Sequence, residues 1–143
     1  MVPAIKNYLS MFQWEEKYSV GIQSINNQHK IIFVHLNDLL NAMKQGQGSD
    51  ITAQIVMKLE SYAISHFQKE EFFFQRFNFQ GSAEHIREHN DFTKKVASLK
   101  ADLKSGKITL SFELLNFLKD WIDHHILVID KQYSECFRQN GLK

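Results

Sequence analysis

Apolar residues recur every three or four positions through most of the chain, which is the spacing of one face of an α-helix. Four such stripes follow one another, over residues 22–44, 51–77, 83–104 and 110–138. Short segments with Gly and Ser separate them, at 45–50, 77–82 and 105–109, and either Ser49 or Asp50 is expected to cap the second helix. Long helices with short connections predict an all-α fold, an antiparallel up-down-up-down four-helix bundle.

The first twenty residues do not continue this pattern. They contain Pro3, Trp14 and Tyr18 but no sustained helical period, so we expect an N-terminal arm that packs on the bundle through its aromatic side chains. A chain of 143 residues that is 43% apolar is suited to one compact unit. The prediction is a single domain over residues 1–143, with the arm at 1–20 and the bundle at 21–143.

Charge and composition argue against several classes of partner. The net charge is +1 and the charged residues are mixed along the chain, so neither nucleic acid nor an anionic membrane surface is an expected partner. No apolar run is long enough for a membrane span or a secretory signal. The single cysteine, Cys136, cannot form an intramolecular disulfide. These features predict a soluble protein of the cytoplasm.

Histidines and carboxylates interrupt the apolar stripes at matching heights. His66 and Glu70 are four residues apart, as are His85 and His89, so each pair shares one face of its helix. At a rise of about 1.5 Å per residue, residues that are equally far from a connecting turn lie at the same height in two antiparallel helices. By this count, candidate residues from all four helices lie in one layer of the bundle. Buried imidazoles and carboxylates are costly unless something satisfies them, and a metal does so. The candidate ligands are His29, His66, Glu70, His85, His89, His125 and Asp130.

The size and chemistry of this set indicate the metal. Seven ligands are too many for one zinc ion, whereas two octahedral ions that share bridging carboxylates would use them all. A set rich in imidazole favours iron over magnesium or calcium. The alternative for any single histidine is a buried or surface residue without metal, and only the joint pattern outweighs it. Asp130 is five residues from His125, about 140° around an ideal helix, so either it reaches in from the flank or the helix is locally widened.

Three further residues are expected to lie off the ligand layer. Glu71 is turned about 100° from Glu70 on an ideal helix, so a solvent-facing position is predicted. His35 and His124 lie off the inward faces and are expected at the surface or in a supporting position beside the ligands.

The motifs together resemble the hemerythrin family, in particular its single-domain bacterial members. They are Trp14 with 18–22, Gln28-His29, His66-Phe67-x-x-Glu70-Glu71, His85-x-x-x-His89-x-x-Phe92 and Trp121-x-x-x-His125-Ile126-x-x-x-Asp130. The resemblance implies a non-haem di-iron centre with an oxo or hydroxo bridge. His85, His89 and His125 would hold one iron, His29 and His66 the other, and Glu70 and Asp130 would bridge both. O2 would bind reversibly as a peroxide-level adduct at the open position of the second iron.

The same resemblance implies oxygen transport or storage, with no catalytic residues and no enzymatic turnover. A dry O2 pocket is expected around the ligands, formed by Ile32, Phe33, Phe67, Trp121, Val128 and Ile129. Two departures from the family pattern are Asn26, where an acidic residue is usual, and the 79–81 turn, where Tyr-Pro is usual. An oxygen or redox sensor, and a di-iron enzyme acting on O2, peroxide or nitric oxide, remain alternatives. The sequence identifies no protein partner or reductase, and it is compatible with a monomer or a weak homo-oligomer.

Overall fold

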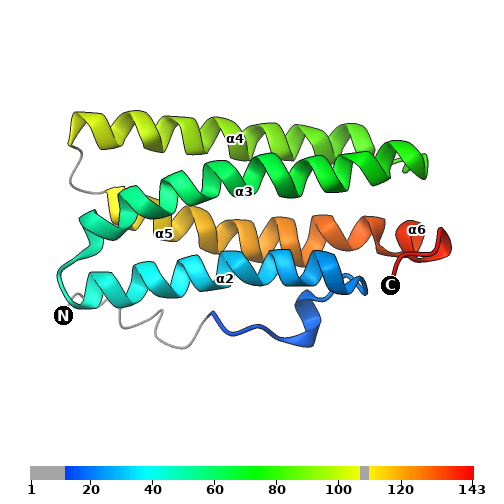
Figure 1. The fold of residues 1–143 in the computed structure, drawn as a ribbon, viewed down its shortest axis with the longest axis horizontal. Helices are drawn as coiled ribbons and strands as arrows, with labels where there is room; N and C mark the ends of the chain where they lie inside the picture. The colour runs from blue at the N-terminus through cyan, green and yellow to red at the C-terminus, as the bar shows by residue number, and fades with distance from the viewer. Residues whose placement is uncertain (1–11, 107–109) are drawn as a thin grey trace.

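The computed structural model of the protein describes residues 12–106 and 110–143, and it has an elongated bundle of helices (Figure 1). Three of the rods are α2 (Gln23–Lys44), α3 (Gly48–Arg76) and α4 (Ser82–Ser105). The fourth begins with α5 (Leu110–Asp120), and the colour gradient in Figure 1 shows that successive rods run in opposite directions. The predicted all-α antiparallel four-helix bundle is confirmed. Expectations for residues 1–11 and 107–109 lie outside the described residues.

The fourth rod changes its helical type along its length. After α5 the chain continues as a π-helix, η2 (Trp121–Ile129), then a 3₁₀ turn, η3 (Asp130–Tyr133), and finally α6 (Ser134–Gln139). The uniform α-helix predicted over 110–138 is therefore wrong in detail. A π-helix closes its hydrogen bonds over five residues in place of four, which widens the turn and changes which side chains share a face.

Two apolar clusters enclose the middle of the bundle. The larger one fills the part nearer the α2–α3 connection, where Leu39, Leu59, Leu99 and Leu114 are completely buried. The smaller one closes the other end and comprises Val20, Ile22, Ile25, Phe74, Tyr133 and Phe137. Burial of these stripes is the main stabilising contribution to the fold. Any polar layer between the clusters is shielded from water along the bundle axis.

A left-handed glycine ends α4, and α3 begins without a side-chain cap. Gly106 follows α4 at φ +74°, in the left-handed region that glycine adopts without strain, and its N–H bonds back to the last turn. The helix α3 begins at Gly48 without a side-chain cap, so the predicted cap by Ser49 or Asp50 is wrong.

The described part of the arm packs on α2 through aromatic rings, as predicted. Trp14 and Tyr18 lie 5.5 and 5.0 Å from the ring of Phe33, measured between centroids. Asn26 fastens the end of the arm, because its Oδ1 accepts the Val20 N–H at 2.9 Å and its Nδ2 donates to Ser19 Oγ at 2.8 Å. An acidic residue at this position would lack the amide donor. Within the described residues no helix is both long and apolar enough to cross a membrane.

Candidate metal centre

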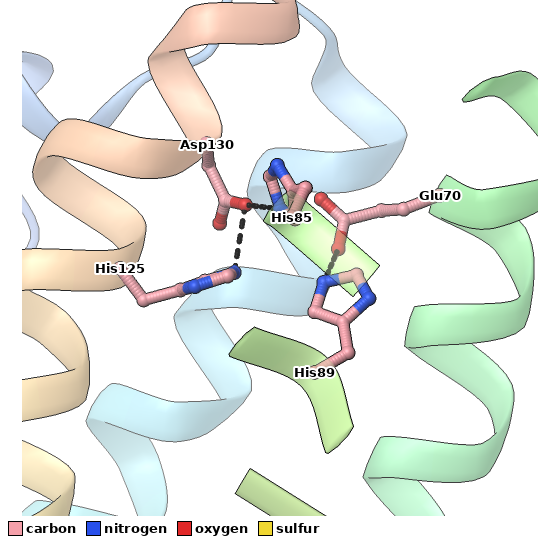
Figure 2. Close-up of side chains that lie close together, drawn as sticks. All are labelled: Glu70, His85, His89, His125 and Asp130. Carbon is pink, nitrogen blue, oxygen red and sulfur yellow. Dashed lines mark ion pairs between the residues drawn. The ribbon is translucent and has the colours of Figure 1, made fainter. Parts of the chain in front are cut away.

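The seven predicted ligands meet in the middle of the bundle, and five of them are drawn in Figure 2. Every one is at most 2% exposed. They form two sets that share Glu70, and within each set the candidate ligand atoms lie within 4.8 Å of one another. We call the rings on α4 and η2 the three-histidine group (His85, His89 and His125) and the rings on α2 and α3 the two-histidine group (His29 and His66).

Asp130 lies between the two groups. Its Oδ1 is 2.8 Å from His85 Nε2 and 3.0 Å from His125 Nε2, and its Oδ2 is 3.0 Å from His29 Nε2 (Figure 2 shows the first two contacts). One oxygen therefore faces the three-histidine group and the other faces the two-histidine group. This is the arrangement of a carboxylate that can bridge two metal positions.

Glu70 also contacts both groups, but through a single oxygen. Its Oε1 is 3.2 Å from His66 Nε2 and 3.2 Å from His89 Nε2. Because His66 belongs to the two-histidine group and His89 to the three-histidine group, the second carboxylate also contacts both.

The π-helix explains how Asp130 reaches the layer. In an ideal α-helix Asp130 would project about 140° away from His125. The wider turns of η2 bring residues five apart closer to one face, and Asp130 follows η2 directly. Of the two alternatives left open by the sequence, local widening of the helix is the correct one.

The polar atoms of the layer fit a bound cation. Nε2 of His29, His85, His89 and His125, together with both carboxylate oxygens of Glu70 and Asp130, is buried without an acceptable hydrogen bond among the described residues. The imidazole nitrogens and the carboxylate oxygens nevertheless lie as close as 2.8 Å, between His85 and Asp130. Two buried carboxylates and several imidazole lone pairs aimed at the same space are costly alone, and a metal ion would satisfy them together.

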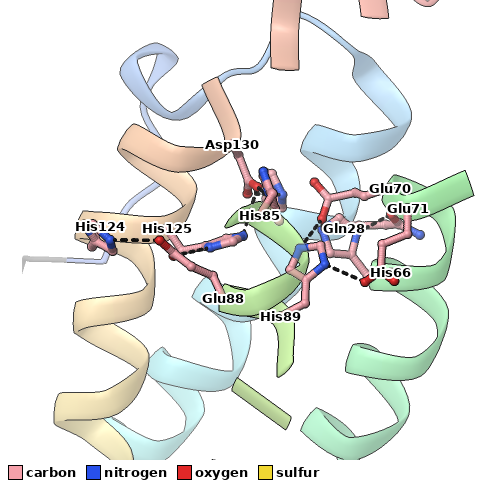
Figure 3. Close-up of polar contacts among 11 residues, drawn as sticks. Gln28, His66, Glu70, Glu71, His85, Glu88, His89, His124, His125 and Asp130 are labelled. Carbon is pink, nitrogen blue, oxygen red and sulfur yellow. Dashed lines mark hydrogen bonds and ion pairs between the residues drawn. The ribbon is translucent and has the colours of Figure 1, made fainter. Parts of the chain in front are cut away.

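Polar partners behind three of the rings fix how those rings are protonated (Figure 3). Nδ1–H of His66 donates to the side-chain amide oxygen of Gln28, Oε1, which can only accept. Nδ1–H of His89 donates to Glu71 Oε2 at 2.8 Å, and Nδ1–H of His125 donates to Glu88 Oε1 at 2.9 Å. In the neutral ring each bond keeps the proton on Nδ1 and leaves the Nε2 lone pair for the interior.

The sequence pattern predicted a role for none of these outer partners. Glu71 was expected to face solvent, but its side chain is only 34% exposed and it holds His89, so that prediction is wrong. Glu88 received no role, yet it also accepts a contact from exposed His124 at 3.3 Å. Both glutamates reach rings that project from a neighbouring helix, and no spacing within one helix marks such a contact. His35 is buried and lies outside the ligand set, so a surface position is wrong for it.

The charges of the layer shift its pKa values strongly in the metal-free protein. Burial opposes protonation of His125, but the charge of Asp130 and the hydrogen bond to Glu88 outweigh it and raise the His125 pKa to about 9. Burial likewise opposes ionisation of Asp130, yet His125 and His29 hold its pKa well below the usual range. Burial is the dominant influence on His66 and lowers its pKa.

Aromatic rings surround the ligands. Phe67 stacks on His89 with centroids 3.9 Å apart, and Trp121 stacks on His125 at 3.7 Å. Ile32 and Phe33 are also buried, and Ile129 is half-buried. Val128 is 49% exposed, so its predicted position in an oxygen pocket is wrong.

Three rings that the sequence analysis did not assign to the pocket complete these surroundings. Tyr62 stacks on His66 with centroids 5.0 Å apart, while Phe74 and Tyr133 lie 4.8 and 5.5 Å from the His85 ring. Tyr62 is four residues before His66 and Phe74 is four after Glu70, so helical spacing could have identified both.

Comparison with known proteins identifies the family. The sequence model of the Hemerythrin HHE cation binding domain matches residues 20–136. The chain belongs to the hemerythrin family. Bacteriohemerythrin of Pseudomonas paraeruginosa is 31% identical over 127 residues, which cover 89% of this chain and 82% of that protein. Bacteriohemerythrin of Clostridium acetobutylicum is also 31% identical, covering 87% of this chain and 100% of its own. Hemerythrin-like protein of Naegleria gruberi is 30% identical, covering 87% and 92%.

Family membership and the geometry of the buried cluster agree. A hemerythrin domain that gathers five imidazoles and two carboxylates in one water-shielded layer supports a non-haem iron centre at this position.

Proposed function

We propose that this protein binds O2 reversibly at a centre of two iron ions and serves in oxygen transport or storage, without enzymatic turnover. The observation that carries the proposal is the contact of each carboxylate with both histidine groups. Asp130 lies 2.8 Å from His85 and 3.0 Å from His29, and Glu70 lies 3.2 Å from both His89 and His66. A single metal ion would need only one of the two groups.

In this proposal the three-histidine group would hold one iron and the two-histidine group the other, and Glu70 and Asp130 would contribute to both positions. The first position then has five protein ligands and the second has four. Iron ions bound there would supply the electrons and the free coordination position that reversible O2 binding needs. The shortage of protein ligands on the two-histidine side marks that position as the one that receives O2.

The side chains around the ligands support carriage of a small apolar gas. Stacked rings such as Phe67 and Trp121 keep water and anions away from the ligand layer, and a water-poor site slows irreversible oxidation. Recognition of a polar substrate would require charged or hydrogen-bonding groups aimed into a cleft, with room for that substrate. The described surroundings are predominantly aromatic and aliphatic, which supports a carrier over an enzyme.

Metal analysis and visible spectroscopy test the proposal. Iron-loaded protein is expected to contain two irons per chain and to develop an absorption band in air that disappears on deoxygenation and returns over repeated cycles. The Asp130→Ala variant should lose the reversible band, whereas His124→Ala, which changes an exposed histidine, should keep it. One iron per chain, or continuous O2 consumption with an added reductant, would refute this function.

A further inference from the structure

The outer partners of the histidines differ between the two groups. In the three-histidine group, His89 and His125 each donate to a carboxylate, from Glu71 and Glu88. In the two-histidine group, His66 donates to the amide oxygen of Gln28. The Nδ1 atoms of His29 and His85 have no hydrogen-bond partner within residues 12–106 and 110–143. Carboxylate support is thus confined to one of the two groups.

This difference changes how strongly each ring donates to a metal. A carboxylate that accepts the Nδ1–H draws the proton toward itself, which raises the electron density and basicity at Nε2. A neutral amide oxygen accepts the same bond more weakly, because hydrogen bonds to charged groups are roughly twice as strong as neutral ones. Outer partners of this type typically change metal affinity about 10-fold to 100-fold.

Electrostatic attraction acts in the same direction. Glu71 and Glu88 each add a negative charge one ring away from the three-histidine position, and their side chains are 34% and 28% exposed. Water screens these charges only in part. Gln28 adds no net charge behind the two-histidine position.

We propose that the two metal positions are unequal, and that Glu71 and Glu88 make the three-histidine position the tighter one, so that it fills first. The inference rests on the two-metal centre of the proposed function and adds an order of loading to it. Glu71 and Glu88 are positioning residues in this scheme, because each acts through the ring that it orients. Gln28, which is neutral, leaves the two-histidine position with the lower metal affinity. The position that is to receive O2 is therefore also the last to fill and the first to empty.

Titration of the metal-free protein with Co²⁺ under anaerobic conditions tests the order. Calorimetry gives the dissociation constant of each step, and the visible Co²⁺ bands report the ligand field of the ion bound first. Wild-type protein should bind two ions in separate steps. Glu71→Gln and Glu88→Gln should each weaken the first step about 10-fold or more, shift its visible bands and leave the second step unchanged. Gln28→Glu should strengthen the second step.

A matched control tests whether loss of a carboxylate charge away from the ligands has the same effect. Glu60 on α3 is 42% exposed and pairs with Lys100 by a 3.2 Å contact, and it belongs to neither ligand set. Glu60→Gln removes the same charge and should leave both steps unchanged. His29→Ala assigns the steps, because it should abolish the second and keep the first. Circular dichroism of each metal-free variant confirms that the helices are formed.

The outcomes distinguish this inference from the function beneath it. Saturation at one ion per chain would refute the two-metal centre itself. Two ions bound with equal affinity, or Glu88→Gln weakening both steps alike, would overturn the proposed order while leaving the two-metal centre intact. An effect of Glu60→Gln as large as that of Glu88→Gln would overturn the role of the glutamates behind the ligand rings.

Discussion

Raising the pH should destabilise the metal-free protein, because it neutralises the positively charged His125 ring. That ring lies between the carboxylates of Asp130, on its Nε2 side, and Glu88, on its Nδ1 side. The pKa of His125 is about 9 in the folded protein, against an ordinary value of 6.5. A folded-state pKa above the unfolded one gives stability that is complete below about pH 6.5 and lost as pH rises through about 9. At 1.36 kcal/mol per unit, this shift corresponds to about 3 kcal/mol.

Other groups in the layer do not cancel this effect in the same interval. The Asp130 pKa is lowered in the folded protein, so its contribution is lost only in acid, well below the interval. Burial lowers the pKa of His66, so the contribution of His66 is lost as pH falls below about 6.5. The variant His125→Gln retains a polar side chain but has no proton to lose, and it therefore isolates the contribution of His125.

Urea denaturation followed by circular dichroism measures the effect. Between about pH 6.5 and pH 9.5 the metal-free wild type should lose about 3 kcal/mol more than metal-free His125→Gln. Iron-loaded wild type should not show this loss, because a histidine that ligates through Nε2 is already neutral with its proton on Nδ1. Equal pH dependence in the wild type and the variant would refute the reasoning, since it would mean that no proton is held at His125.

Three substitutions outside the ligand set test the core packing, the attachment of the arm and the end of α4, by urea or thermal denaturation. Leu114→Ala should cost about 3 kcal/mol, because Leu114 is completely buried, and metal content should not change; a loss below that of an exposed Val34→Ala would contradict this. Asn26→Ala should cost about 1–2 kcal/mol and speed proteolysis of the arm, because it leaves the Val20 N–H without its acceptor. Gly106→Ala should cost about 1 kcal/mol from backbone strain, because Gly106 has φ +74° and no atom of the described residues lies within 4 Å of a Cβ placed there; an unchanged melting temperature would count against this.

The bundle and the ligand set were predictable because both are properties of single helices. Leu36, Leu59 and Leu99 recur with the helical period, and the period alone tells which face is buried. The connecting turns then fix the heights of the four stripes. His29 and His66 lie level because each is about four turns from the same connection. Local spacing and chain direction were sufficient to bring the five histidines and Glu70 into one layer, whereas the position of Asp130 stayed undecided.

Contacts between helices were not predictable in the same way. Glu71 and Glu88 lie at the flanks of their helices, and their partners project from other rods or other faces. Whether such a side chain meets a ring or solvent depends on how neighbouring helices are rotated. The apolar stripe of a helix is about 100° wide or more. It therefore does not define the rotation of the helix about its axis closely enough to tell whether a residue at the edge of the stripe meets a neighbouring ring or solvent.

The π-helix in the fourth rod explains why the inward position predicted for Val128 was wrong and why the position of Asp130 was undecided. On an ideal α-helix, three residues beyond His125 fall about 60° short of a full turn and five residues overshoot it by about 140°. The first angle predicted an inward Val128, and the second left Asp130 undecided. A π-helix rotates less per residue, so Val128 falls further short and turns to solvent, while the overshoot of Asp130 shrinks and its carboxylate enters the layer. The loss of Val128 from the interior and the gain of Asp130 are therefore one structural event.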